Sequence, residues 1–505
     1  MNIKEAKRYI EESVEMYLKK DEDGEYRIPV VRQRPIFLLG APGIGKTAIM
    51  EQIASELNIA LVSYSMTHHT RQSALGLPFI SHKEYEGNEY DVSEYTMSEI
   101  IASIYDVMKN SSIKEGILFL DEINCVSETL APSMLQFLQY KVFGRHKVPN
   151  GWVIVTAGNP PEYNKSVRDF DIVTLDRMKI IEVEADYSVW KEYAKNKELH
   201  PAIIGFIDIN KDYFYSVETT VKGKNYITAR GWEDLSEMIK LYEESNLPVR
   251  KTLVEQYIRN EKVVREFIAY YDVFKKYQSS YNVGEILSGI YSDSIIEKGK
   301  KAPLEERMSI IGMIVDEVCH NIKENIFEAN VLNDVLKPLK SIKADINSLS
   351  VNELTEKVKN ILYAREEQLR KLENSGAISS KVKKHNKEVI KIFAGINDKI
   401  NKNTYDSASL MFNDIKSYYD ERTLLYKTKT NNVKERLHNA FSFVEKTFGD
   451  GNEMLILMTE LTVIDECAIF ISKYGSEDYS MHNKEMMLSN KSDYILKKIN
   501  EIEGI

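Results

Sequence analysis

The spacing of apolar and polar residues divides the chain into two regions. Up to about residue 185, short aliphatic runs alternate with helical patterns, and the runs are 36–39, 60–64, 117–120, 153–156 and 179–183. Continuous apolar runs of this length are typical of strands buried on both faces, and strands alternating with helices favour a parallel sheet. After about residue 186 the apolar positions recur at helical spacing. The pattern predicts an α/β region with a parallel five-stranded sheet, opened by an amphipathic helix and followed by a helical region.

Composition narrows the class of protein. The chain has 505 residues with 67 Lys and Arg against 77 Asp and Glu, which gives a net charge of −10. A net negative chain attracts nucleic acid poorly. The three cysteines, Cys125, Cys319 and Cys467, are far apart, which excludes a disulfide scaffold or a zinc finger. No apolar run approaches the roughly 18 residues of a membrane span, and the first residues are charged where a signal peptide is apolar. We therefore expect a cytoplasmic protein.

A phosphate-binding loop follows the first apolar run. It matches the pattern G-x-x-x-x-G-K-[ST] and comprises Gly40, Ala41, Pro42, Gly43, Ile44, Gly45, Lys46 and Thr47. A helix is predicted to follow from Ala48, which we include among the phosphate-binding residues. Glycines let successive backbone N–H groups turn toward a polyphosphate, and the helix N-terminus adds its positive end. Lys46 is then expected to bind the β- and γ-phosphates, and the Thr47 hydroxyl to bind Mg²⁺.

Two carboxylates end the third apolar run. Asp121 and Glu122 follow 117–120 directly, and ligands of parallel sheets bind at the carboxyl ends of the strands. We expect Asp121 to coordinate Mg²⁺ through water and Glu122 to accept a proton from the attacking water. Taken alone, an Asp-Glu pair after a strand is also a common polar strand end.

With these two motifs the chain resembles the AAA+ ATPases, and three later segments are similar to those of the MoxR branch. The segment 153–160 resembles the sensor-1 strand, 174–178 the segment with the arginine finger, and 228–236 the sensor-2 helix. Residues 1–280 carry the resemblance. It implies that Asn159 orients the lytic water, that Arg177 reaches the nucleotide of a neighbouring subunit, and that Arg230 couples the lid to the γ-phosphate.

The same resemblance implies an organisation and a role. We expect an AAA+ core over residues 1–185, an α-helical lid over 186–290 and a helical C-terminal domain of unassigned role over 291–505. ATP and Mg²⁺ are the implied cofactors. The implied active form is a homo-oligomer, a hexamer, that remodels a protein client together with a von Willebrand factor A-domain partner.

Other interpretations stay open at this stage. A nucleotide-gated scaffold that hydrolyses slowly shares the same motifs, although it has no need of Glu122 and Arg177. A DNA-associated motor shares the core, although the negative charge disfavours it. Two insertions, 76–100 and a tight hairpin at 143–146, are expected either to face a central pore and engage the client or to be solvent loops.

Overall fold

The five aliphatic runs form one parallel sheet. In the computed structural model its strands are β1 (Ile36–Gly40), β2 (Ala60–Ser65), β5 (Gly116–Asp121), β8 (Trp152–Gly158) and β9 (Lys179–Val183). Their order is β2-β5-β8-β1-β9, so β2 is an edge strand, and the register places Ser65 beside Asp121. The predicted α/β fold is confirmed. The structure describes residues 1–483 except 69–71, 73, 75, 144, 164–166, 169, 221 and 222.

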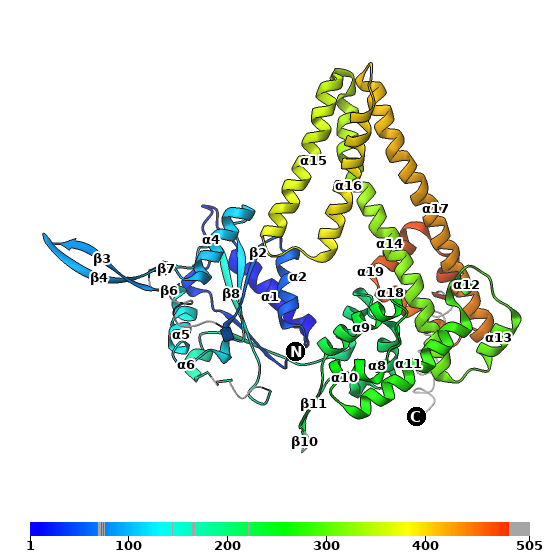
Figure 1. Ribbon diagram of the computed structural model, residues 1–505, viewed down its shortest axis with the longest axis horizontal. Coiled ribbons are helices and arrows are strands. Elements are labelled where there is room, and N and C mark those ends of the chain that lie inside the picture. The colour runs from blue at the N-terminus through cyan, green and yellow to red at the C-terminus, as the bar shows by residue number, and fades with distance from the viewer. Residues whose placement is uncertain are drawn as a thin grey trace, which may run out of the picture. The chain divides into compact units, whose positions relative to one another are not determined.

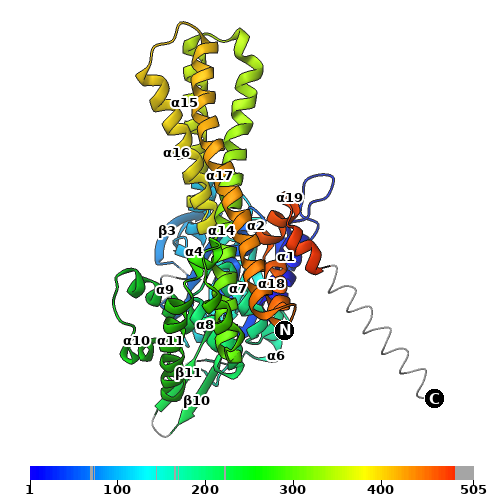
Figure 2. The ribbon, with the colours of Figure 1, turned by 90° about the vertical axis from the view of Figure 1, so that its right-hand side faces the viewer.

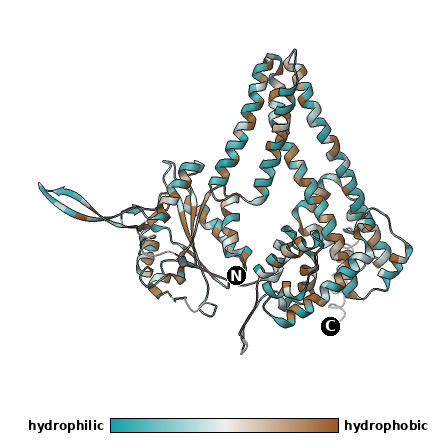
Figure 3. Ribbon diagram, viewed as in Figure 1, coloured by the Kyte–Doolittle hydropathy of each residue, from teal (hydrophilic) through white to brown (hydrophobic). Residues whose placement is uncertain are grey.

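Helices cover the sheet and bury its apolar strands. They are α1 (Ile3–Leu18), α2 (Lys46–Glu56), α4 (Glu99–Ser111), α5 (Ala131–Tyr140) and α6 (Ile172–Leu175), with the short 3-10 turns η1 (Val30–Arg32), η2 (Met66–His68) and η3 (Ile123–Cys125). Asn2 and Glu5 form a capping box at the start of α1, and Ser98 caps α4. The strands of the sheet are brown in Figure 3, in keeping with a core in which Phe119 and Val155 are fully buried.

Two hairpins occupy the predicted insertions. β3 (Pro78–Tyr85) pairs with β4 (Asn88–Tyr95) as a ribbon, and β6 (Val142–Phe143) pairs with β7 (His146–Lys147). The expected tight hairpin at 143–146 is confirmed, although Gly144 lies outside the described residues. Glu94 on β4 accepts from Lys83 and from Arg145, so an ion pair joins the two hairpins.

The chain divides into two compact units. The first contains Met1–Val189 together with Val358–Lys391, and the second contains Trp190–Lys357 and the described residues from Ile392 onward. The three-part division expected from the sequence stays a prediction. No pattern of apolar positions predicts that residues 358–391 pack with the N-terminal region.

The second unit is almost entirely helical, as the apolar spacing predicts. Its elements after α7 (Tyr187–Asn196) are α8 (Pro201–Ile209), η4 (Lys211–Tyr213), α9 (Ala229–Glu244), α10 (Lys251–Tyr257), α11 (Glu261–Tyr281), α12 (Val283–Leu287), α13 (Asp293–Lys300), α14 (Leu304–Asp345), η5 (Ile346–Ser348), α17 (Ala408–Phe448), α18 (Asn452–Val463) and α19 (Asp465–Tyr474). One hairpin, β10 (Ser216–Thr220) with β11 (Gly223–Ile227), interrupts them. The helical expectation is wrong there, because Val and Thr at 217, 219 and 220 favour extended backbone.

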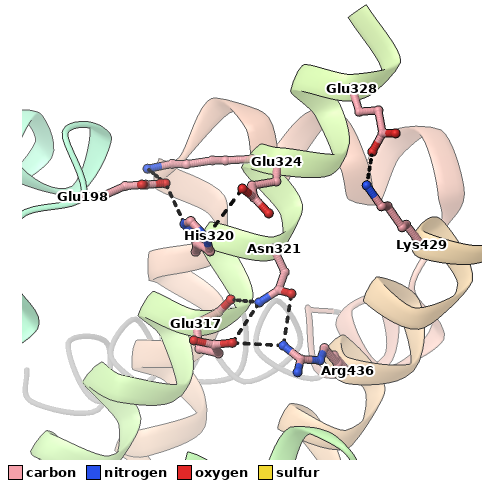
Figure 4. A network of polar contacts seen from close by, with 9 residues as sticks. Glu198, Glu317, His320, Asn321, Glu324, Glu328, Lys429 and Arg436 are labelled. Atoms are coloured by element: carbon pink, nitrogen blue, oxygen red, sulfur yellow. Dashed lines mark hydrogen bonds and ion pairs between the residues drawn. The ribbon is translucent and has the colours of Figure 1, made fainter. Parts of the chain in front are cut away.

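Long helices hold the second unit together. α14 packs against α8, α11, α17, α18 and α19. Figure 4 shows the polar groups that line part of this packing. Arg436 on α17 donates to Glu317 and Asn321 on α14, each at 3.0 Å, and Lys429 pairs with Glu328 at 2.9 Å. Trp232 of α9 is fully buried against Phe206 and Phe267.

A helical hairpin contains residues of both units, because the assignment changes at residues 358 and 392. It consists of α15 (Val351–Asn374) and α16 (Ser380–Lys402), which lie side by side in Figures 1 and 2. An ion pair between Glu373 and Lys383, 2.9 Å long, joins the helices near the turn between them. The halves next to that turn belong to the first unit.

Candidate active site

The phosphate loop joins strand β1, which lies between β8 and β9, to helix α2. Gly43 and Gly45 have φ values of 75° and 96°, a backbone conformation that L side chains rarely adopt. A Cβ on Gly40 would lie 2.6 Å from the carbonyl oxygen of Val183, so β9 also requires glycine there. The helix begins at Lys46, two residues earlier than predicted, and Ala48 is exposed in its first turn. The N-terminus of α2 therefore opens directly onto the loop.

The ammonium group of Lys46 is hydrogen-bonded to the first residues of this loop. Its Nζ donates to the carbonyl oxygens of Gly40 and Ala41 at 2.7 and 2.8 Å, and to Asn159 Oδ1 at 2.9 Å. Only 8% of the residue is exposed. The ammonium group is thus held among oxygen acceptors at the place where a phosphate-binding lysine is needed.

Thr47 and Asp121 meet at the carboxyl end of the sheet. Thr47 Oγ1 donates to Asp121 Oδ2 at 2.8 Å, and the other carboxylate oxygen accepts from the backbone N–H of Glu122 at 2.9 Å. Hydroxyl and carboxylate oxygens are the ligands that Mg²⁺ prefers. The two predicted metal ligands are therefore adjacent.

Glu122 is held by its backbone and by the edge strand. Its φ of 55° places it in the left-handed region, which is uncommon for a residue with a side chain. Ser65, the last residue of β2, donates from Oγ to Glu122 Oε2 at 3.2 Å. In this arrangement the carboxylate of the predicted base is hydrogen-bonded to the neighbouring strand. The sequence analysis did not single out Ser65.

Asn159 is fixed by a residue that the sequence analysis also missed. Asn124 Nδ2 donates to the backbone oxygen of Asn159 at 2.8 Å, and the side chain packs so closely on Gly158 that a Cβ there would lie 2.5 Å from Asn124 Oδ1. Asn124 is 4% exposed. It thus ties the turn after Glu122 to the end of β8. Its place two residues after Glu122 was the available signal.

The two arginines lie in different units. Arg177 is exposed just before β9 in the first unit and donates from Nη1 to Gln139 Oε1 of α5. Arg230 is exposed in the first turn of α9, in the second unit, where Thr228 Oγ1 caps the helix by accepting from Gly231 N at 3.1 Å. Arg177 therefore lies at the surface of the core, hydrogen-bonded to α5.

Cys125 lies next to the site and takes no part in the predicted chemistry. Burial raises the pKa of its thiol, and the carboxylates of Glu122 and Asp121 raise this pKa further. A thiol that stays protonated at neutral pH is a poor nucleophile. This agrees with the interpretation of Cys125 as a packing residue.

The residues present fit a magnesium nucleotide. The loop supplies backbone N–H groups from its glycine turns, Lys46 supplies a positive charge, and Thr47 with Asp121 supplies oxygen ligands. Among the described residues no group of three or more His, Cys, Asp and Glu side chains could hold a metal ion. Mg²⁺ would therefore need the phosphates of the nucleotide to complete its coordination.

Comparison with known proteins also indicates a nucleotide-binding domain in the N-terminal part of the chain. Residues 36–175 match the model of the family described as "ATPase family associated with various cellular activities (AAA)". No curated protein matches the chain. Within the described residues no helix has the length and apolar character that crossing a bilayer requires. The matched segment runs from β1 to the end of α6 and contains the phosphate loop, Asp121, Glu122 and Asn159, so the nucleotide-binding core is an AAA-type P-loop ATPase domain.

Proposed function

We propose that this chain hydrolyses ATP to ADP and phosphate in the presence of Mg²⁺ and uses the energy to remodel a protein client. The observation that carries the proposal is the convergence of five side chains at one end of the parallel sheet. Lys46 donates to Asn159 at 2.9 Å, Thr47 donates to Asp121 at 2.8 Å, and Glu122 follows Asp121 and donates to its carboxylate from the backbone N–H at 2.9 Å. These are the groups that phosphoryl transfer to water requires.

Each residue has one task in the proposed reaction. The loop amides and Lys46 bind the triphosphate, and Thr47 with Asp121 would hold Mg²⁺, which neutralises charge on the phosphate oxygens when bound. Glu122 leaves Ser65, accepts a proton from water at its carboxylate and so activates the nucleophile. The Asn159 amide orients that water.

The active form that we propose is a ring. Arg177 is exposed at the surface of the core, and an arginine supplied to a γ-phosphate in trans raises the rate by about 10³–10⁵. In the proposed hexamer this residue completes the site of the neighbouring subunit, and Arg230 contacts the γ-phosphate from the lid. The order of the motifs supports the MoxR branch and a von Willebrand factor A-domain partner.

The test is steady-state ATP turnover with mass photometry of the same samples. We expect wild type to turn over ATP as an oligomer, and Glu122→Gln to bind ATP with unchanged affinity but to lose about 10²–10⁴ in rate. The matched control is Glu128→Gln, because Glu128 is largely exposed on the same loop. Wild-type turnover below about 10⁻³ s⁻¹ would favour the scaffold. Salt-sensitive retention on DNA would favour the DNA motor.

A further inference from the structure

The turn at the end of the α15–α16 hairpin contacts the edge of the ATPase sheet. The backbone N–H of Leu61, on the outer side of β2, donates to the carbonyl oxygen of Ser375 at 2.9 Å. Both residues belong to the first unit. An unpaired edge strand is a template for further pairing. The turn 375–377, named the tip turn below, therefore takes up a hydrogen-bond donor of β2.

The close approach requires glycine in the tip turn. Gly376 has a φ of 69°, and a Cβ built on it would lie 2.5 Å from the carbonyl oxygen of Leu61. That atom is backbone within a sheet, so it cannot move aside as a flexible side chain could. The N–H and the C=O of Leu61 thus both face the tip turn.

The residues of the tip turn are buried and hydrogen-bonded. Ser375 is 1% exposed and its hydroxyl donates to Leu372 O at 2.7 Å, while Ala377 is 6% exposed. Farther along α15, six residues share a pocket wall with Ser111 and Ile113, which lie at the end of α4 and lead into β5; the six are Tyr363, Ala364, Glu367, Gln368, Lys371 and Leu372. The hairpin therefore contacts the start of β2, and its helix α15 lines a pocket together with the segment that leads into β5.

The other ends of these two strands carry the water-activating chemistry. β2 ends at Ser65, which bonds Glu122, and β5 ends at Asp121. The strands pair in register from Ala60 beside Gly116 to Ser65 beside Asp121. Ser65 lies four positions after Leu61, about 13 Å along an extended chain. One short strand therefore connects the residue that contacts the tip turn with the hydrogen-bond partner of Glu122.

We propose that the tip turn is an autoinhibitory contact of the ATPase. Docked on Leu61, it fixes β2 in the position in which Ser65 holds Glu122 away from its role as base. When the tip turn leaves, β2 is released and Glu122 is free to activate water. The inference rests on the proposed ATPase function, and it assigns to the hairpin the control of that site.

The test compares two glycines that both have a positive φ but differ in what surrounds them. Gly376→Ala and Gly376→Asn add a Cβ against Leu61 O, and asparagine tolerates positive φ, which separates the clash from backbone strain. The controls are Gly24→Ala and Gly24→Asn, since Gly24 has a φ of 84°, lies in an exposed turn of the first unit and has nothing within 4 Å of an added Cβ. The readouts are hydrogen exchange of the Leu61 amide, ATP affinity and ATP turnover.

The expected result is specific to Gly376. In its variants the Leu61 amide exchanges at least about tenfold faster and turnover rises about fivefold or more, with ATP affinity unchanged, while the Gly24 variants behave as wild type. Unchanged exchange in both Gly376 variants would show that the turn is not docked in solution. Faster exchange without a gain in turnover would reduce the contact to a cover for the sheet edge. Either result overturns the proposal.

A failure of the ATPase assignment would look different. If wild type does not hydrolyse ATP, exchange at Leu61 is compared with and without a saturating non-hydrolysable ATP analogue. Because coupling between two sites is reciprocal, faster exchange with the analogue supports the contact as a nucleotide-linked device. An exchange rate at Leu61 that is the same with and without the analogue would overturn the proposal.

Discussion

Among the described residues of the first unit, Lys46 and Lys141 are buried lysines, and they differ in what surrounds them. Lys46, 8% exposed, donates to three oxygens, two of them carbonyls of the phosphate loop and one the side chain of Asn159. Lys141, 3% exposed, follows α5 and donates to the carbonyl oxygen of Leu138 at 2.6 Å. Burial without other charge lowers the pKa of Lys141 to about 7.

The difference shows that burial of a charge does not by itself mark a site. An ammonium group in an apolar surrounding loses its proton more readily, because the charged form is disfavoured. Surrounded by oxygens at the start of a helix, the ammonium group is instead placed to bind an anion. The carbonyl oxygens of the phosphate loop therefore position the ammonium group of Lys46, which together with the loop amides can donate to a phosphate. The turn after α5 only accommodates its lysine.

The largest effect on ATP affinity is expected from removing the ammonium group of Lys46. Lys46→Ala deletes the charge that binds the phosphates and should lower ATP affinity by at least about 100-fold, the scale of a charge-assisted hydrogen-bond network. Isothermal titration calorimetry with a non-hydrolysable analogue measures this, with Lys109→Ala on the exposed end of α4 as the control. Unchanged affinity would remove the phosphate-loop assignment.

Arg177 is an exposed cation, in contrast to the buried Lys46, and we expect it to affect turnover and not binding. Arg177→Ala should leave ATP affinity within about twofold and lower turnover by about 10³, because the guanidinium acts on developing charge in a neighbouring subunit. Arg8→Ala, on the exposed side of α1, is the control. Steady-state turnover and ATP titration give the two quantities.

Mixing distinguishes action in trans from action in cis. Glu122→Gln subunits retain Arg177, and Arg177→Ala subunits retain Glu122, so mixed rings contain some complete sites. We expect partial recovery of turnover that depends on the mixing ratio. If no ratio restores activity, Arg177 does not serve a neighbouring site.

A smaller effect is expected from removing Asn124, which holds Asn159 in place. Asn124→Ala removes the bond that fixes Asn159, and should lower kcat about tenfold with little change in KM, since one hydrogen bond contributes about 1 kcal/mol. Asn110→Ala, exposed on α4, is the control. A lowered melting temperature with unchanged kcat would mean that Asn124 only stabilises the fold.

Asn124 also shows where sequence reasoning ended. The sheet and the phosphate loop are encoded in continuous stretches such as 36–47, so strand, loop and helix could be predicted together. The bond between Asn124 and Asn159 depends on β5 and β8 being neighbours, and the contact of Leu61 with Ser375 depends on packing between distant segments. Neither leaves a periodic pattern in the chain. The roles of Arg177 and Arg230 stay predictions because each depends on a neighbour or on the other unit.

The smallest effect concerns stability and tests the second lysine. With a pKa of about 7 when folded and 10.5 as the ordinary value, Lys141 binds more protons in the unfolded chain between these pH values. The free energy of unfolding therefore rises with pH through this window as far as Lys141 is concerned. Lys141→Met should stabilise the first unit by about 2 kcal/mol at pH 7, after loss of the bond to Leu138, and the gain should vanish toward pH 10. Thermal melts at both pH values measure this against Lys147→Met, an exposed lysine of β7. A gain independent of pH would mean that Lys141 stays charged in its apolar surrounding, and the contrast with Lys46 would then rest on geometry alone.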